Sequence, residues 1–227
     1  WKSFTCNPWD QRMKKPGIAL FSLLLGGTSA VQAASIVDLA VTGLITPTAC
    51  TPQLSDGAVI DYGKISQQDL KVDRSTRLPV KPLHVNIACN APNRFALRMH
   101  DNRDGSAMVN SEIYYGLGLD HSGNRIGLYS MTFDPLQTVV DSTAQAYGTE
   151  STTGGLAWRM ANLNPISIGA NSYLGFTDTA GSTAGPSAIQ TLSSTVKVET
   201  LINATQNLDL SRETALDGLA TLEVVYL

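Results

Sequence analysis

The chain has 227 residues, enough for one large domain or two small ones, and 43% of them are hydrophobic. Its formal net charge is −3, and an acidic chain without basic clusters argues against nucleic acid or anionic lipid as a partner. Four of the 16 Lys and Arg residues precede residue 34, so the acidic excess is larger in the remainder.

Residues 13–33 have the pattern of a secretory signal peptide. A basic start is followed by an apolar run over residues 18–25 and by small residues that end at Ala33. The run is too short to span a bilayer, so the pattern predicts export, with cleavage that leaves Ala34 as the first mature residue. Residues 1–12 do not fit the beginning of such a signal, and we interpret them as a non-native upstream leader.

Alternation of apolar and polar residues with a period of two predicts half-buried strands along the rest of the chain. In chain order the apolar positions are Val37, Leu39, Val41, Gly43 and Ile45; Leu83, Val85, Ile87 and Cys89; Phe95, Leu97 and Met99; Ile126 and Leu128; Val196 and Val198; and Ala220, Leu222, Val224 and Tyr226. Many short strands of this kind predict an all-β sandwich or barrel.

Segments rich in turn-forming residues separate several of these strands. We expect turns at residues 90–93, 102–105, 122–124 and 217–218. Residues 156–163 are compatible with a short helix that Pro165 would stop, and residues 177–187, rich in Gly, Ser, Thr and Ala, predict a loop.

Two cysteines, Cys50 and Cys89, remain once the leader with Cys6 is set aside. An even number of cysteines in an exported chain predicts one disulfide. The alternative is a pair of buried free thiols.

The residues with reactive side chains do not form a recognisable catalytic motif. His84, His100 and His121 lie outside the spacings that bind metals, and no serine stands in a nucleophile elbow. Residues 101–105 resemble a calcium loop only weakly, and an ordinary turn explains them better. We expect no metal, no cofactor and no enzymatic activity.

A few aromatic residues have the chemistry to stack on a sugar, but core packing or scattered surface positions are their more common fate. They are Tyr114, Tyr115, Tyr129 and Trp158.

The order of these features resembles a chaperone–usher pilin, and more closely a fimbrial protein of the DUF1120 type. The alternating segment 37–45 follows the signal directly, and Cys50 comes next. The stretch Asp61-Tyr62-Gly63-Lys64-Ile65 and the strand that ends in Cys89 follow in the order found in pilins. The chain closes with an alternating strand in which Tyr226 is penultimate.

This resemblance implies an immunoglobulin-like Greek-key β-sandwich of the pilin type over residues 47–227, completed by a donated strand. It implies that the extension 34–46 is the donor, inserting Val37, Leu39, Val41, Gly43 and Ile45 into a neighbouring subunit. The partners implied are other fimbrial subunits, a periplasmic chaperone and an outer-membrane usher. An edge that contains Leu222, Val224 and Tyr226 would contact the chaperone or the next subunit.

The function implied is that of a structural subunit which polymerises by donor-strand exchange into a surface fimbria and supports adhesion. Three alternatives stay open. Residues 34–46 can instead be the first strand of a complete sandwich. The chain can be a minor or tip adhesin that binds host glycans. A β-sandwich hydrolase is the third, and no motif supports it.

Overall fold

The computed structural model describes residues 37, 39–43 and 49–227, and the chain divides into two compact units, residues 1–44 and 45–227. In the first unit, residues 37 and 39–43 belong to no strand or helix. The predicted leader, signal peptide and Ile45 lie outside the described residues. No helix among the described residues is long and apolar enough to cross a membrane.

The second unit is all-β, which confirms the predicted class. Its only helical elements within the described residues are short 3₁₀ turns. In chain order the elements are β1 (Cys50–Leu54), η1 (Ser55–Ala58), η2 (Gln67–Asp69), β2 (Thr76–Arg77), β3 (Lys81–Asp101), β4 (Tyr115–Gly116), β5 (Gly127–Phe133), η3 (Pro135–Gln137), β6 (Thr138–Val140), β7 (Tyr147–Ser151), β8 (Ile166–Ser167), β9 (Tyr173–Thr177), β10 (Ala188–Ile202), η4 (Thr205–Asn207) and β11 (Ala220–Tyr226).

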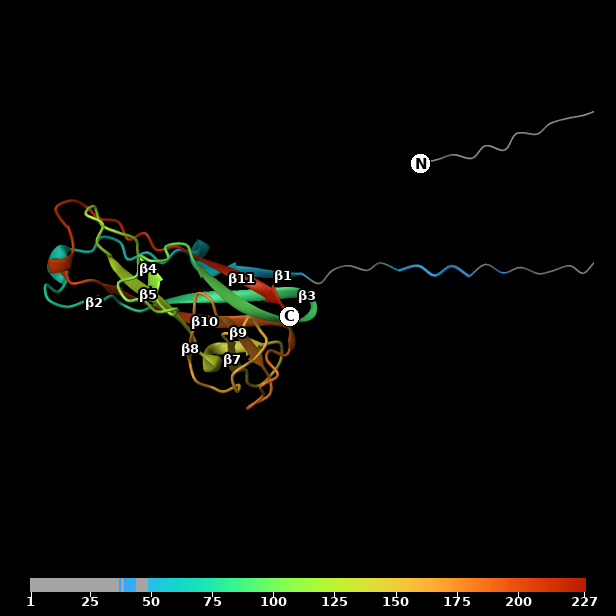
Figure 1. Cartoon of the computed structure of the whole chain (residues 1–227). Helices are drawn as coiled ribbons and strands as arrows, with labels where there is room; N and C mark the ends of the chain where they lie inside the picture. The colour runs from blue at the N-terminus through green and yellow to red at the C-terminus, as the bar shows by residue number, and fades with distance from the viewer. Residues whose placement is uncertain (1–36, 38, 44–48) are drawn as a thin grey trace, which may run out of the picture. The chain divides into compact units, whose positions relative to one another are not determined.

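The long strand β3 organises the whole sheet, whose main path is β4-β5-β10-β3-β9-β7 (Figure 1). The first half of β3 pairs with β1 and β10, and its second half pairs with β11 and β9. Every ladder between the described strands is antiparallel. The result is one curled antiparallel sheet, and β3 links its parts.

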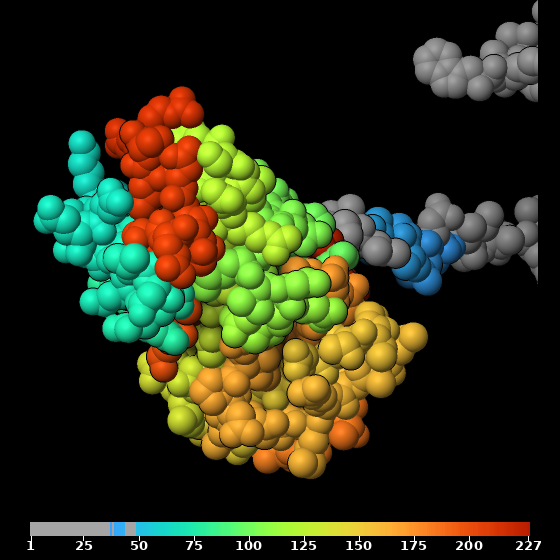
Figure 2. All heavy atoms as spheres, turned by 60° about the vertical axis from the view of Figure 1, so that its left-hand side comes forward, coloured from blue at the N-terminus to red at the C-terminus, as the bar shows by residue number. Residues whose placement is uncertain are grey.

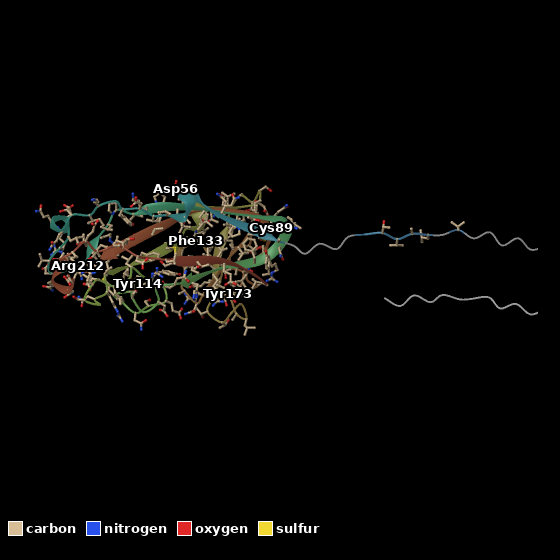
Figure 3. All side chains as sticks on the ribbon, turned by 90° about the horizontal axis from the view of Figure 1, so that it is seen from above. Asp56, Cys89, Tyr114, Phe133, Tyr173 and Arg212 are labelled. Atoms are coloured by element: carbon tan, nitrogen blue, oxygen red, sulfur yellow. A yellow bond between two sulfur atoms is a disulfide. The ribbon has the colours of Figure 1, made fainter. Side chains whose placement is uncertain are left out.

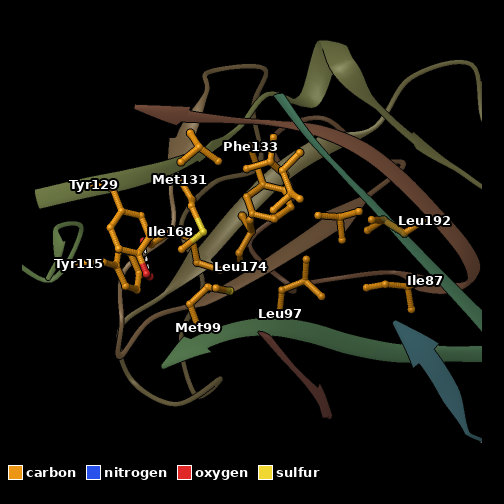
Figure 4. Close-up of a cluster of buried hydrophobic side chains, with 14 of the residues drawn as sticks. Ile87, Leu97, Met99, Tyr115, Tyr129, Met131, Phe133, Ile168, Leu174 and Leu192 are labelled. Atoms are coloured by element: carbon orange, nitrogen blue, oxygen red, sulfur yellow. Dashed lines mark hydrogen bonds between the residues drawn. The ribbon is translucent and has the colours of Figure 1, made fainter. Parts of the chain in front are cut away.

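The period-two pattern of β3 explains how the sheet encloses its core. Val85, Ile87, Phe95 and Leu97 are at most 2% exposed, because alternate side chains of a strand point to the same face. They join one hydrophobic cluster with side chains of β5, β9 and β10 (Figure 4).

Two tyrosines lie at one side of this cluster (Figure 4). The rings of Tyr115 and Tyr129 lie 5.3 Å apart between centroids, and the Tyr115 hydroxyl donates to the backbone oxygen of Ile168 at 2.9 Å. Burial raises the pKa of both phenols. These rings therefore belong to the core, as expected.

Two local predictions were wrong. Residues 90–93, predicted as a turn, lie inside β3, where the register against β10 shifts between Ile189 and Thr191. Pro92 has no N–H to donate, and an irregularity in the ladder lets the strand continue past it. Residues 156–163, predicted as a helix, form an irregular loop between β7 and β8 whose backbone bonds to β7 instead.

The disulfide prediction is confirmed. Cys50 and Cys89 are bonded, and they face each other at the start of the ladder between β1 and β3. Figure 3 places Cys89 and Arg212 toward opposite ends of the described domain, with Phe133 between them. The disulfide therefore ties β1 to β3 at one end of the sheet.

Candidate functional site

The C-terminal strand β11 leaves one of its backbone edges unpaired. It pairs with β3 from Ala220 opposite Asp101 to Tyr226 opposite Phe95, and with no other described strand. An edge strand with free N–H and C=O groups is a template on which another strand can add. We call this edge, with the side chains of residues 220–226, the β11 edge.

The β11 edge is also apolar on its inner face. Ala220, Leu222 and Val224 pack against the hydrophobic cluster but stay partly exposed, whereas Thr221 and Glu223 face solvent. Fully burying a Leu or Val side chain stabilises by about 1.5–3 kcal/mol relative to leaving it exposed, so a strand that covers this row gains hydrophobic as well as backbone energy.

Strand β1 lies near the end of this edge (Figure 1). The backbone N–H of Cys50 donates to the Tyr226 hydroxyl at 2.7 Å, and Leu227 N–H donates to Arg94 O at 3.1 Å. Like β11, β1 pairs with β3 alone among the described strands. Tyr226 therefore connects the C-terminal strand to the disulfide-bonded start of β1.

Replacing this tyrosine by Phe tests that connection. Tyr226→Phe should lower the free energy of unfolding by about 1 kcal/mol, because it removes the acceptor for the Cys50 N–H while keeping the ring. Urea unfolding measures the change. Tyr114→Phe is the matched control, since the Tyr114 hydroxyl bonds to no described residue. Equal effects of both substitutions would show that the Tyr226 hydroxyl contributes nothing.

The predicted donor residues are only partly described. The side chains of Val37, Leu39 and Val41 are between 88% and 90% exposed, and an added side chain at Gly43 would meet no atom within 4 Å. Side chains at every second residue point to one face when such a segment is extended, so these three would form one apolar row. Ile45 lies outside the described residues.

The other residues singled out in the sequence do not gather into a site. His84, His100 and His121 are exposed, as expected for surface histidines. Trp158 is half-buried in the loop between β7 and β8, and its indole N–H donates to Gly155 O. Among the described residues, no group of three or more His, Cys, Asp or Glu side chains is placed to hold a metal ion.

Comparison with known proteins finds similarity to one family over part of the chain. Residues 39–114 match the family model described as "Protein of unknown function (DUF1120)". This confirms the resemblance to DUF1120 over a segment that begins at Leu39 and includes β1 and β3.

Two curated proteins of Escherichia coli (strain K12) are similar to the chain. "Uncharacterized protein YhcF" is 22% identical over 237 residues, which cover 90% of this chain and 98% of that protein. "Protein GltF" is 29% identical over 119 residues, which cover 43% of this chain and 47% of that protein. Neither name states an activity, so the function has to be argued from the geometry.

Proposed function

We propose that this chain is a structural subunit of a chaperone–usher fimbria, exported through the periplasm to the cell surface. In this proposal the domain is an immunoglobulin-like sandwich that lacks its last strand, and subunits join by donor-strand exchange. The observation that carries the proposal is the β11 edge, an unpaired strand edge with a half-covered apolar row.

In this proposal the exposed N-terminal segment is the strand that one subunit donates to another. Its apolar side chains repeat every second residue, so they point to one face when the segment is extended beside β11. Strand addition of this kind combines main-chain hydrogen bonds with side chains that enter alternate positions. A periplasmic chaperone would cover the same edge, including Leu222, Val224 and Tyr226, until a subunit replaces it at the usher.

A peptide experiment tests the proposal. A synthetic peptide with the sequence of residues 34–46, added to a chain that begins at residue 47, should raise the free energy of unfolding by RT ln(1 + [L]/Kd). This gain is about 2.7 kcal/mol at a hundredfold excess over Kd. A peptide of the same composition in scrambled order should have no effect. Equal stabilisation by both peptides, or by neither, would count against donor-strand addition.

A further inference from the structure

The second candidate binding site is a polar pocket, whose lining residues are distant in the sequence from those of the β11 edge. Its volume is about 550 Å³, within the range of small-molecule sites. Three segments line it: the loop before β4, strand β7, and the chain from residue 159 through β8 to Ser172. Figure 2 shows the green segment around residue 110 next to the gold and orange segments between residues 150 and 180.

Backbone bonds hold these walls in place. Arg159 N–H donates to Glu150 O at 2.8 Å, and Gly148 and Asn162 exchange a pair of backbone hydrogen bonds. In the loop before β4, the Glu112 O accepts from Ala170 N–H at 2.8 Å. The pocket is therefore built from paired backbone rather than from free loop ends.

The carboxylate of Glu150 is the less exposed of the two carboxylates that line the pocket. Its side chain is only 18% exposed, yet it accepts no hydrogen bond from a described residue and has one ion pair, to Arg159 at 3.5 Å. Good charge-assisted contacts are about 2.7–2.9 Å long. Because no buried side-chain oxygen among the described residues lacks a hydrogen-bond partner, the Glu150 oxygens stay accessible to solvent. The Arg159 side chain is itself 76% exposed and leaves them room to accept from a ligand.

The remaining lining groups suit a cation on a carbon chain. The Glu112 carboxylate and the Asn164 side-chain amide bond to no described residue and are free to accept hydrogen bonds. Met160 and Ile166 supply apolar wall beside them. A primary ammonium group has three N–H donors, and the two carboxylates and the Asn164 amide oxygen supply acceptors of the kind that it needs.

We propose that this pocket binds a protonated primary amine carried on a short carbon skeleton, with Glu150 as its main counter-ion. Arg159 is then the chain's own cation, which the incoming amine displaces from Glu150. This site is independent of the proposed assembly function. A lysine side chain and an amino sugar carry the same ammonium group, so they are two sources of one ligand chemistry.

Calorimetric titration of the exported chain tests the proposal. The probes are Nα-acetyl-lysine methylamide and glucosamine, each compared with its neutral counterpart in which the amine is acetylated. We expect at least one amine to bind and both acetylated forms to fail. The amine that binds identifies the source. Failure of both amines, or equal binding of an amine and its acetylated form, would overturn the proposal.

Three variants assign the roles within the pocket. Glu150→Gln should weaken amine binding about tenfold or more, because it removes a charge-assisted contact. Arg159→Ala should instead strengthen binding severalfold, since it removes the competing cation, and weaker binding by this variant would contradict the assignment. Glu213→Gln, an exposed carboxylate outside the pocket, is the control and should leave affinity unchanged.

The variants remain informative if one of them folds poorly. Glu150 lies on β7, so circular dichroism should first confirm native structure in Glu150→Gln. Glu112→Gln changes an exposed carboxylate and should also weaken binding, by a smaller factor. If Glu112→Gln and Arg159→Ala both bind the amine as the unaltered chain does, the proposal is wrong.

Discussion

A chain that lacks residues 34–45 should fold as stably as the full chain and still fail to donate a strand to a second subunit. Val37, Leu39 and Val41 are almost fully exposed, so their removal costs the chain little of its own packing. In a polymer each of the large apolar side chains would gain about 1.5–3 kcal/mol on burial, and main-chain pairing with β11 would add to this. The deletion therefore removes nearly all of the expected assembly energy.

A single substitution at Gly43 should also impair strand donation without lowering the stability of the chain itself. An added side chain there meets no atom within 4 Å in the chain itself, so Gly43→Leu should leave its stability unchanged. Glycine lets two backbones approach closely, and a bulky side chain at this point would clash with the receiving subunit. Thr42→Leu is the matched control, because residue 42 lies on the opposite face of the extended segment.

Oligomers that resist detergent until they are heated are the readout for both variants. The full chain, expressed with the chaperone and usher that we propose as its partners, should form a ladder of such oligomers. The deletion variant and Gly43→Leu should bind chaperone through the β11 edge. Neither should donate a strand to another subunit in the ladder. A normal ladder from the deletion variant would make residues 34–46 an ordinary first strand, or a segment without a role in assembly.

Removing the disulfide should destabilise the domain by about 4 kcal/mol, the second large effect that we expect. The bond closes a separation of 39 residues between β1 and β3, and in the chain-entropy model such a loop restricts the unfolded state by about that amount. Because the total stability of a domain is about 5–15 kcal/mol, the loss should also lower the amount of folded protein that accumulates.

The double variant Cys50→Ser, Cys89→Ser measures this effect without leaving a free thiol. Urea unfolding should show a lower free energy of unfolding, and reduction of the unaltered protein should reproduce most of the change. Reduction of the double variant is the control and should change nothing. A double variant as stable as the oxidised protein would mean that the β1 ladder holds without the bond.

The long strands could be predicted from the sequence because their signal is local. In β3 and β10, every second residue from Leu83 to Cys89 and at Val196 and Val198 is buried, and a period of two is the signature of such strands. The disulfide could also be predicted, since Cys50 and Cys89 are the two cysteines that follow the predicted signal peptide.

The short elements and the pocket could not be predicted in this way. Strands β4 and β8 have two residues each, so only their pairing with β5 defines them. Pro92 does not mark a turn, because a turn residue can also lie in a strand irregularity. The pocket combines residues such as Glu112 and Glu150 that are distant in sequence, and no local pattern connects them.

Photo-cross-linking tests most directly whether the N-terminal segment of one subunit covers the β11 edge of another. Val41 is replaced by p-benzoylphenylalanine in an isotopically heavy chain, which is assembled with light chains and irradiated, and the cross-linked peptides are identified by mass spectrometry. The account predicts cross-links from residue 41 of heavy chains to residues 219–227 of light chains. Cross-links confined to residues of the same heavy chain, or none to the β11 edge, would contradict it.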